Sequence, residues 1–118
     1  MKDLTIAAIQ TNAPLGAVEQ NLANHVRLAH EAADAGAELI CFPELGITGH
    51  WCAGEVWAAA EPVPDGPSTR RLLDLAAERE VFISFGLAER DRGIAYNTQV
   101  VVGPAGLVGK QRKLHMSA

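Results

Sequence analysis

A short apolar run that stops abruptly at a proline constrains this chain most. Leu39–Phe42 is a run of four apolar residues, and Pro43 and Glu44 follow at once. Four residues are too few for a helix, and an unbroken apolar run is typical of a strand buried on both faces of a parallel sheet. Ligands of open α/β sheets bind beyond the carboxyl ends of the strands. The fold alone therefore allows a functional Glu44, although a solvated turn carboxylate is the simpler interpretation.

The residues before this run predict a β-α-β unit. Leu4–Gln10 is predicted as a mostly buried first strand. Apolar residues then recur at spacings of three and four, the period of an amphipathic helix over residues 17–35: Val18, Leu22, Val26, Ala29 and Ala33. Gly36 is placed to end that helix in a left-handed cap. With a strand over 38–42 directly after it, the short connections predict a right-handed crossover and two parallel strands.

The remainder predicts one more helix and an antiparallel meander. Pro67 close to Asp65 and Ser68 is a helix-start signature. The helix that follows is expected to bury Leu72, Leu75 and Ala76. Strands are predicted over 81–88, 95–102 and 107–113, because tight turns separate them. The fold class is therefore α/β.

Length and composition limit the classes of function. A chain of 118 residues is expected to form one domain, which can bury roughly two thirds of its unfolded surface. The net charge of −4 is small and the basic residues form no long run, which argues against nucleic acid and anionic membranes as partners. No apolar run approaches the roughly 20 residues of a membrane span, and polar residues interrupt any signal-peptide core. We expect a small-molecule partner and a cytoplasmic location.

The cysteines and histidines do not form a metal or disulfide pattern. Cys41 and Cys52 lack Cys-x-x-Cys spacing, and reduced thiols are expected. His25 and His30 would lie about 140° apart around a helix, at roughly 100° per residue. We expect no metal and no cofactor.

Three blocks of the sequence resemble the nitrilase superfamily, the carbon–nitrogen hydrolases that cleave nitriles, amides and carbamoyl groups. In chain order they are Ile6–Gln10, similar to the first strand, Phe42–Leu45 with Thr48-Gly49, similar to the first catalytic block, and Arg112–His115, similar to the catalytic-lysine block. The resemblance implies a four-layer α-β-β-α sandwich, often dimeric through one helical face. Residues 1–118 would be the N-terminal part of one such domain, about its first half.

The resemblance also implies a Glu-Lys-Cys triad. Glu44 would be the general base and acid, Lys113 would hold the oxyanion, and a cysteine on a later strand would be the nucleophile. The set is chemically coherent, because a thiol with a pKa of about 8.5 needs a base, and a neighbouring cation balances the charge. Strand alternation puts Lys113 opposite Arg112, so that one faces the site and the other solvent.

The expected nucleophile has no match in this sequence. The chain ends five residues beyond Lys113, Cys41 is expected in the packed core, and Cys52 lies in a long segment after Glu44. The chain alone is therefore predicted to be inactive. Half a sandwich would expose apolar sheet, so we expect association with itself or with a complementing chain.

Two further features and two rival interpretations complete the prediction. His50 and Trp51, in the long segment after Glu44, are predicted to line a substrate pocket, with ordinary packing of a long loop as the equal alternative. Tyr96-Asn97 resembles a recurrent pair of the family, and we expect it to pack and not to act in catalysis. The main rival is a non-catalytic α/β module that binds a ligand or a partner, and the second is an unrelated small hydrolase that uses Cys41 or Cys52. A doubly wound nucleotide-binding domain is disfavoured, because no Gly-rich phosphate turn follows the first strand.

Overall fold

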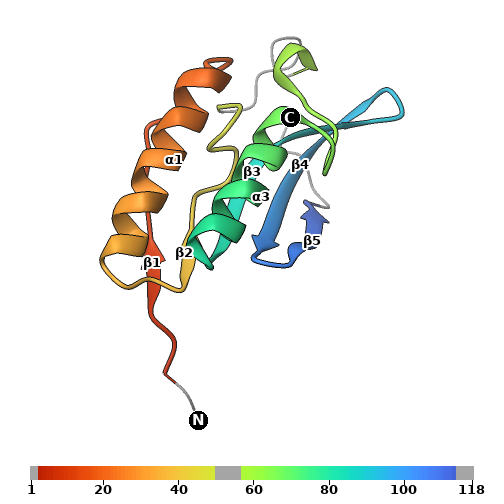
Figure 1. Ribbon diagram of the computed structural model, residues 1–118. Helices are drawn as coiled ribbons and strands as arrows, with labels where there is room; N and C mark the ends of the chain where they lie inside the picture. The colour runs from red at the N-terminus through yellow and green to blue at the C-terminus, as the bar shows by residue number, and fades with distance from the viewer. Residues whose placement is uncertain (1–2, 50–56, 114–118) are drawn as a thin grey trace.

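The computed structural model describes residues 3–49 and 57–113, which form one five-stranded sheet with two helices on one face (Figure 1). The strands lie side by side in chain order: β1 (Ile6–Ala8), β2 (Leu39–Cys41), β3 (Phe82–Asp91), β4 (Ile94–Gly103) and β5 (Gly106–Arg112). Strands β1, β2 and β3 are parallel, whereas β3, β4 and β5 are antiparallel. The predicted order of a β-α-β unit, a second helix and a meander is confirmed. No helix in this part of the chain is long and apolar enough to cross a membrane.

Helix α1 (Val18–Asp34) ends as predicted, but its buried face differs from the prediction. Gly36 has a φ of 95°, and its N–H bonds back to the carbonyl of Ala33 as in a left-handed cap. The completely buried side chains are Asn21, His25 and Ala29, and the first two are polar. The apolar residues predicted for this face pack at the margin of the core and are partly exposed, Ala29 excepted. The helix thus directs two polar side chains inward.

Helix α3 (Pro67–Arg79) begins at the predicted proline but takes its cap from a distant residue. Gly66 is the N-cap and makes no side-chain bond. Instead, the Glu61 carboxylate accepts hydrogen bonds from the backbone N–H of Ser68 at 2.8 Å and from its hydroxyl at 2.6 Å. These bonds satisfy one of the unpaired N–H groups of the first turn.

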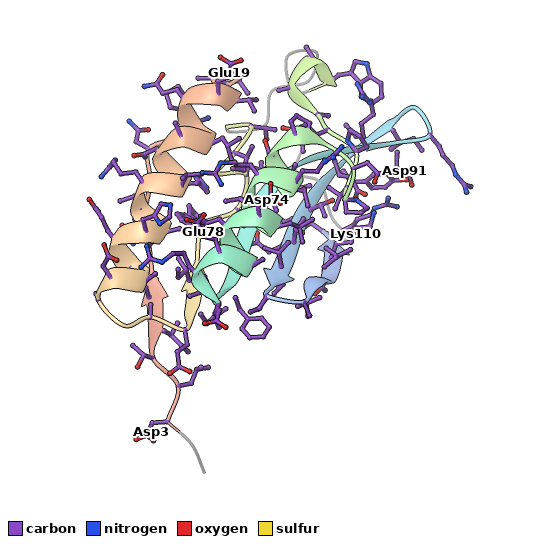
Figure 2. The ribbon with its side chains drawn as sticks, in the orientation of Figure 1. Asp3, Glu19, Asp74, Glu78, Asp91 and Lys110 are labelled. Carbon is purple, nitrogen blue, oxygen red and sulfur yellow. The ribbon has the colours of Figure 1, made fainter. Side chains whose placement is uncertain are left out.

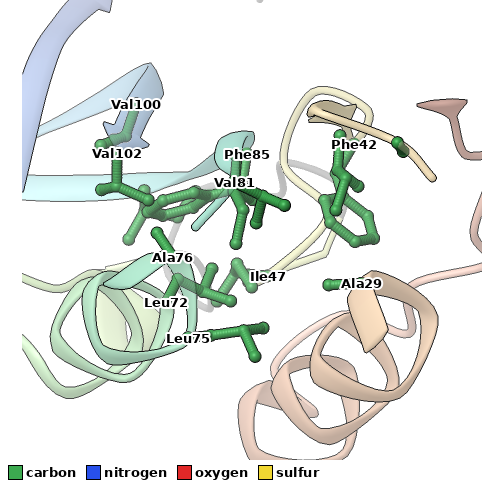
Figure 3. Packing of buried hydrophobic residues seen from close by; sticks show 14 residues of the cluster. Ala29, Phe42, Ile47, Leu72, Leu75, Ala76, Val81, Phe85, Val100 and Val102 are labelled. Carbon is green, nitrogen blue, oxygen red and sulfur yellow. The ribbon is translucent and has the colours of Figure 1, made fainter. Parts of the chain in front are cut away.

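The core fills the space between the sheet and the two helices. Figure 3 shows Phe42, Phe85 and Val100 on the sheet side, facing Ala29 of α1 and Leu72 of α3. The stripe predicted for α3, which is Leu72, Leu75 and Ala76, is completely buried. Burial of one large apolar side chain of this kind contributes about 1.5–3 kcal/mol. The hydrophobic core therefore lies between one face of the sheet and a single layer of helices.

The other face of the sheet is open, as expected for half of the sandwich, but the predictions of a mostly buried first strand and of a second strand buried on both faces were wrong. The strand register sets Ile6, Leu39 and Phe82 in one row, and Ile6 and Phe82 are 56% and 44% exposed. The first strand is therefore not mostly buried, and only Ile40 of β2 is completely buried. The apolar run predicts burial on both faces, but the described residues cover only one of them.

Candidate active site

Glu44 lies in a turn that leaves the sheet at the carboxyl end of β2 and returns to it. The N–H of Phe42 bonds to the carbonyl of Ser84, and that of Ile47 bonds to the carbonyl of Gly86. Between these two anchors Pro43 ends the strand. The chain reverses there through Leu45, which has a φ of 55°. Both ends of the Glu44 turn, residues 42–47, are therefore fixed to β3.

Gly86 permits the turn to pack directly on the backbone of β3. A β-carbon at Gly86 would lie 2.5 Å from the Leu45 nitrogen and 3.0 Å from the Glu44 Cα. Real side chains do not come this close to backbone atoms. The position of Glu44 over the sheet therefore depends on the absence of a β-carbon at residue 86.

Lys113 reaches Glu44 from the last strand. Its N–H donates to the Asn97 carbonyl at 2.8 Å, which continues the β4–β5 ladder one residue beyond the end of β5. Its Nζ lies 3.2 Å from Glu44 Oε1, across 69 residues of sequence. The structure thus brings together the two residues that the sequence predicts as catalytic. The side chains of Lys113 and Glu44 are 50% and 54% exposed, so the pair is open to solvent.

Asn97 gives the same carboxylate a second donor. Its Nδ2 donates a hydrogen bond to Glu44 Oε1, the oxygen that also meets Lys113. The prediction assigned packing to both members of the Tyr96-Asn97 pair, and Tyr96 does pack, because the Arg112 guanidinium lies 3.9 Å from the centre of its ring. Strand alternation was the signal that could have separated them. Neighbouring residues of β4 face opposite ways, and Asn97 lies beside Lys113.

Arg112 lies opposite Lys113 as predicted, but it binds carboxylates on the helical face of the sheet and does not simply meet solvent. Its Nε donates to Glu89 Oε1 and its terminal nitrogen to Asp91, both at 2.8 Å. Lys110, two residues earlier on the same face, also pairs with Glu89. Figure 2 labels Lys110 on β5 and Asp91 at the end of β3. These ion pairs attach β5, with Lys113 at its end, to β3.

Glu89 is charged although it is almost completely buried, with 1% of its side chain exposed. Burial would raise the pKa of Glu89, but hydrogen bonds from Arg112, Lys110 and Thr98 outweigh it and hold the pKa below its usual value. The same contacts with Glu89 and Asp91 raise the pKa of Arg112. Glu89 and Arg112 are therefore both charged at neutral pH, and their ion pair stabilises the strand that carries Lys113.

With this geometry established, comparison with known proteins shows the family. The family model described as carbon-nitrogen hydrolase matches residues 5–118. The chain belongs to the carbon–nitrogen hydrolase family.

Two curated relatives and one solved structure show how much of the family fold is present. A nitrilase of Pyrococcus abyssi is 38% identical over 113 residues, which cover 94% of this chain and 43% of the relative. An aliphatic nitrilase of Rhodococcus rhodochrous is 32% identical over 123 aligned residues, 92% of this chain and 34% of the relative. The crystal structure of an N-terminal amidase has the same fold, with a TM-score of 0.82 at 22% identity, over 97% of this chain and 28% of that one. This chain thus spans less than half the length of those proteins.

The other residues predicted for the hydrolase site are placed differently or not described. His50, Trp51 and Cys52 lie outside the described residues. Cys41 alternates with the buried Ile40, so it faces the open side of the sheet and is half-buried, beside Ser84. The prediction that Cys41 belongs to the packed core was therefore wrong, because no layer covers that face in the described structure. Within residues 3–49 and 57–113, no group of three or more His, Cys, Asp or Glu side chains could hold a metal ion.

Proposed function

We propose that Glu44 and Lys113 are the general base and the oxyanion-binding cation of a hydrolase that acts on non-peptide amide, carbamoyl or nitrile groups. The single observation that carries the proposal is their 3.2 Å contact across 69 residues of sequence. The two residues follow different strands, β2 and β5, so that the fold and not the local chain brings them together. The names of the two relatives, a nitrilase and an aliphatic nitrilase, support the same substrate class.

The proposed reaction begins with a proton transfer from a cysteine thiol to Glu44. The thiolate attacks the carbonyl carbon of an amide, and the electron pair of the C=O bond moves to the oxygen, which Lys113 stabilises as an oxyanion. Glu44 then gives the proton to the departing nitrogen, so that ammonia leaves and a thioester remains. Water hydrolyses the thioester, with Glu44 again acting as base. A positioned general base of this kind contributes about 10²–10⁴-fold to the rate.

The nucleophile would come from outside these 118 residues. Cys41 lies within β2, and it has a strand backbone on both sides, which is a poor position for a nucleophile that must meet Glu44 and a substrate together. The half-exposed Glu44–Lys113 pair also lacks the dry surroundings in which such charges act most strongly. We propose that the remaining part of the same domain, or a complementing chain, covers the open sheet face and supplies the cysteine. For the chain by itself, we propose that copies associate through exposed apolar residues such as Phe82.

A non-catalytic α/β module is the second candidate. The observation that favours it is the exposure of Glu44 and Lys113 to solvent. A carboxylate and an ammonium group open to water can also bind a polar ligand without catalysing a reaction. The two candidates differ in turnover and in their dependence on a thiol.

The test is to complete the domain and measure ammonia release. The chain is extended with the coding sequence that follows it, or mixed with a complementing polypeptide, and assayed on aliphatic amides, nitriles and carbamoyl amines. Glu44→Gln and Lys113→Ala should each lower the rate by at least about 100-fold. Glu78→Gln, an exposed carboxylate on α3, is the matched control and should have no effect.

Two results would contradict the proposal. A completed domain in which Glu44→Gln keeps the full rate would remove Glu44 from the reaction. Hydrolysis by the 118-residue chain alone, dependent on Glu44, would mean that one of its own cysteines is the nucleophile.

A further inference from the structure

His25 is buried directly beneath the segment that carries Glu44. Only 1% of its surface is exposed, and its ring stacks on Phe42 with the ring centres 4.2 Å apart and an angle of 21° between the planes. Its Nδ1 lies 2.8 Å from the backbone oxygen of Asn21. Because a carbonyl oxygen can only accept, Nδ1 carries the proton and donates it. Nε2 is then the unprotonated nitrogen, and no described residue gives it a hydrogen-bond partner.

Gly46 closes over this second nitrogen. A β-carbon at Gly46 would lie 2.8 Å from His25 Nε2 and 3.0 Å from Cε1. The imidazole thus contacts the chain on both sides of Glu44, at Phe42 before it and at Gly46 after it. Small movements of the ring therefore act directly on the Glu44 turn.

No charged group offsets a charge on this ring within the described structure. On α1 its buried neighbours are Asn21 and Ala29, which have no charge. The ionisable group of the overlying turn is Glu44, and its carboxylate contacts Lys113 and Asn97. The ring itself makes no ion pair with any described residue and bonds only to the Asn21 carbonyl.

We propose that His25 is a positioning residue for Glu44: the neutral imidazole supports the Glu44 turn, and a proton on Nε2 releases it. The new N–H would point at Gly46. The Pro43 carbonyl lies 3.3 Å from the same β-carbon position, but it already accepts from the Gly46 N–H and makes no bond to Nε2. A buried cation without a partner is strongly unfavourable. The ring would have to reach water, so the turn above it would have to open. Opening would separate Glu44 from Asn97 and Lys113. The effect of this release on catalysis rests on the proposed function. The coupling between the protonation of His25 and the position of the Glu44 turn does not.

The direction of the titration agrees with the geometry. Burial lowers the pKa of His25, although the hydrogen bond to the Asn21 carbonyl acts in the opposite direction. The ring therefore stays neutral at pH 7 and takes up its proton only below the ordinary histidine value of about 6.5. Glu44 would be held in place at neutral pH and released once the pH falls below the lowered pKa of His25.

The test is an NMR titration of the 118-residue chain from pH 8 downwards, continued past the midpoint of His25, which needs no substrate. The side-chain amide of Asn97 reports on its bond to Glu44, and the Cε1–H of His25 reports on the ring. The Asn97 resonance should shift with the same midpoint as that of His25. In His25→Phe, which keeps an aromatic ring against Phe42, this shift should disappear. His30→Phe on the same helix is the matched control and should keep it, because His30 bonds to Arg79 on α3.

The outcomes separate the possibilities. The same Asn97 profile in the wild type and in His25→Phe would refute the coupling. If His25→Phe does not fold, the wild type still decides, because different midpoints for His25 and Asn97 would also refute it. Glu44→Gln removes the titration of that carboxylate, and the shift that follows His25 should remain. A completed domain without hydrolase activity would contradict the proposed function and leave this result unaffected.

Discussion

Replacement of Gly86 by alanine should displace the Glu44 turn and destabilise the fold. The new β-carbon would lie 2.5 Å from the Leu45 nitrogen, 2.9 Å from Gln99 Oε1 and 3.0 Å from the Glu44 Cα. The Gln99 side chain can rotate away, but the two backbone atoms can yield only if the whole turn moves. Overpacking of this kind costs about 1–3 kcal/mol. An alanine also restricts the unfolded chain, which offsets about 0.4–1 kcal/mol of that cost. We expect a net loss of about 1–2 kcal/mol.

Gly109→Ala is the matched control for Gly86→Ala. Gly109 lies in β5, and a β-carbon there would meet no atom within 4 Å. The alanine should therefore leave the free energy of unfolding unchanged or raise it by about 0.4–1 kcal/mol. Urea unfolding followed by circular dichroism measures the free energy of unfolding of both variants. In thermal unfolding, each kcal/mol should shift Tm by about 4–8 °C. In Gly86→Ala the side-chain amide resonance of Asn97 should also move, because Asn97 binds Glu44. A Gly86→Ala variant as stable as Gly109→Ala, with that resonance unmoved, would refute the reasoning.

Three further predictions concern the polar contacts. Glu89→Gln should lower the free energy of unfolding by about 1–3 kcal/mol. The variant should also lose less stability in acid than the wild type, because the folded pKa of Glu89 lies below the unfolded one and its stabilisation is lost as the pH falls below about 5. Equal loss of stability in acid in both proteins would contradict this. Asn21→Ala removes hydrogen bonds to two backbone carbonyls and should lower the free energy of unfolding by about 1–3 kcal/mol. Asn24→Ala on the same helix removes a surface hydrogen bond from Arg27 and should change the free energy of unfolding by less than about 0.5 kcal/mol. A double-mutant cycle of Glu44→Gln with Lys113→Ala should give a coupling energy below about 1 kcal/mol, since both side chains are half-exposed, and a larger value would show that the pair is shielded from water.

Local patterns were enough to predict the elements. The period of the first helix, its end at Gly36, the start of the second helix at Pro67 and the meander all follow from short-range signals, and the structure has each of them. The strand limits differ by one to three residues: β1 is Ile6–Ala8 and not Leu4–Gln10, and β3 ends at Asp91 and not at Ala88. Strand ends depend on which backbone groups find a partner, and a sequence pattern does not show that.

The support beneath Glu44 could not be predicted from sequence. Asn21 and His25 interrupt the expected apolar face of α1 and would ordinarily be assigned to solvent, yet both are buried. Asn21 bonds to the carbonyls of Pro14 and Ile47, so it holds the segment after β2 from below. A polar residue is accepted in the core only where such partners exist, and the partners come from other segments.

The sequence by itself determined the order of the elements, the family resemblance and the two candidate catalytic residues, because these depend on residue types and spacing along the chain. Only the tertiary structure decided that Lys113 and Asn97 both donate to one carboxylate oxygen of Glu44, that Gly86 leaves room for the turn, and that His25 lies beneath it. The physical reason is that these contacts join residues far apart in sequence. Their geometry is set by the register of the sheet and by the packing of α1 against it.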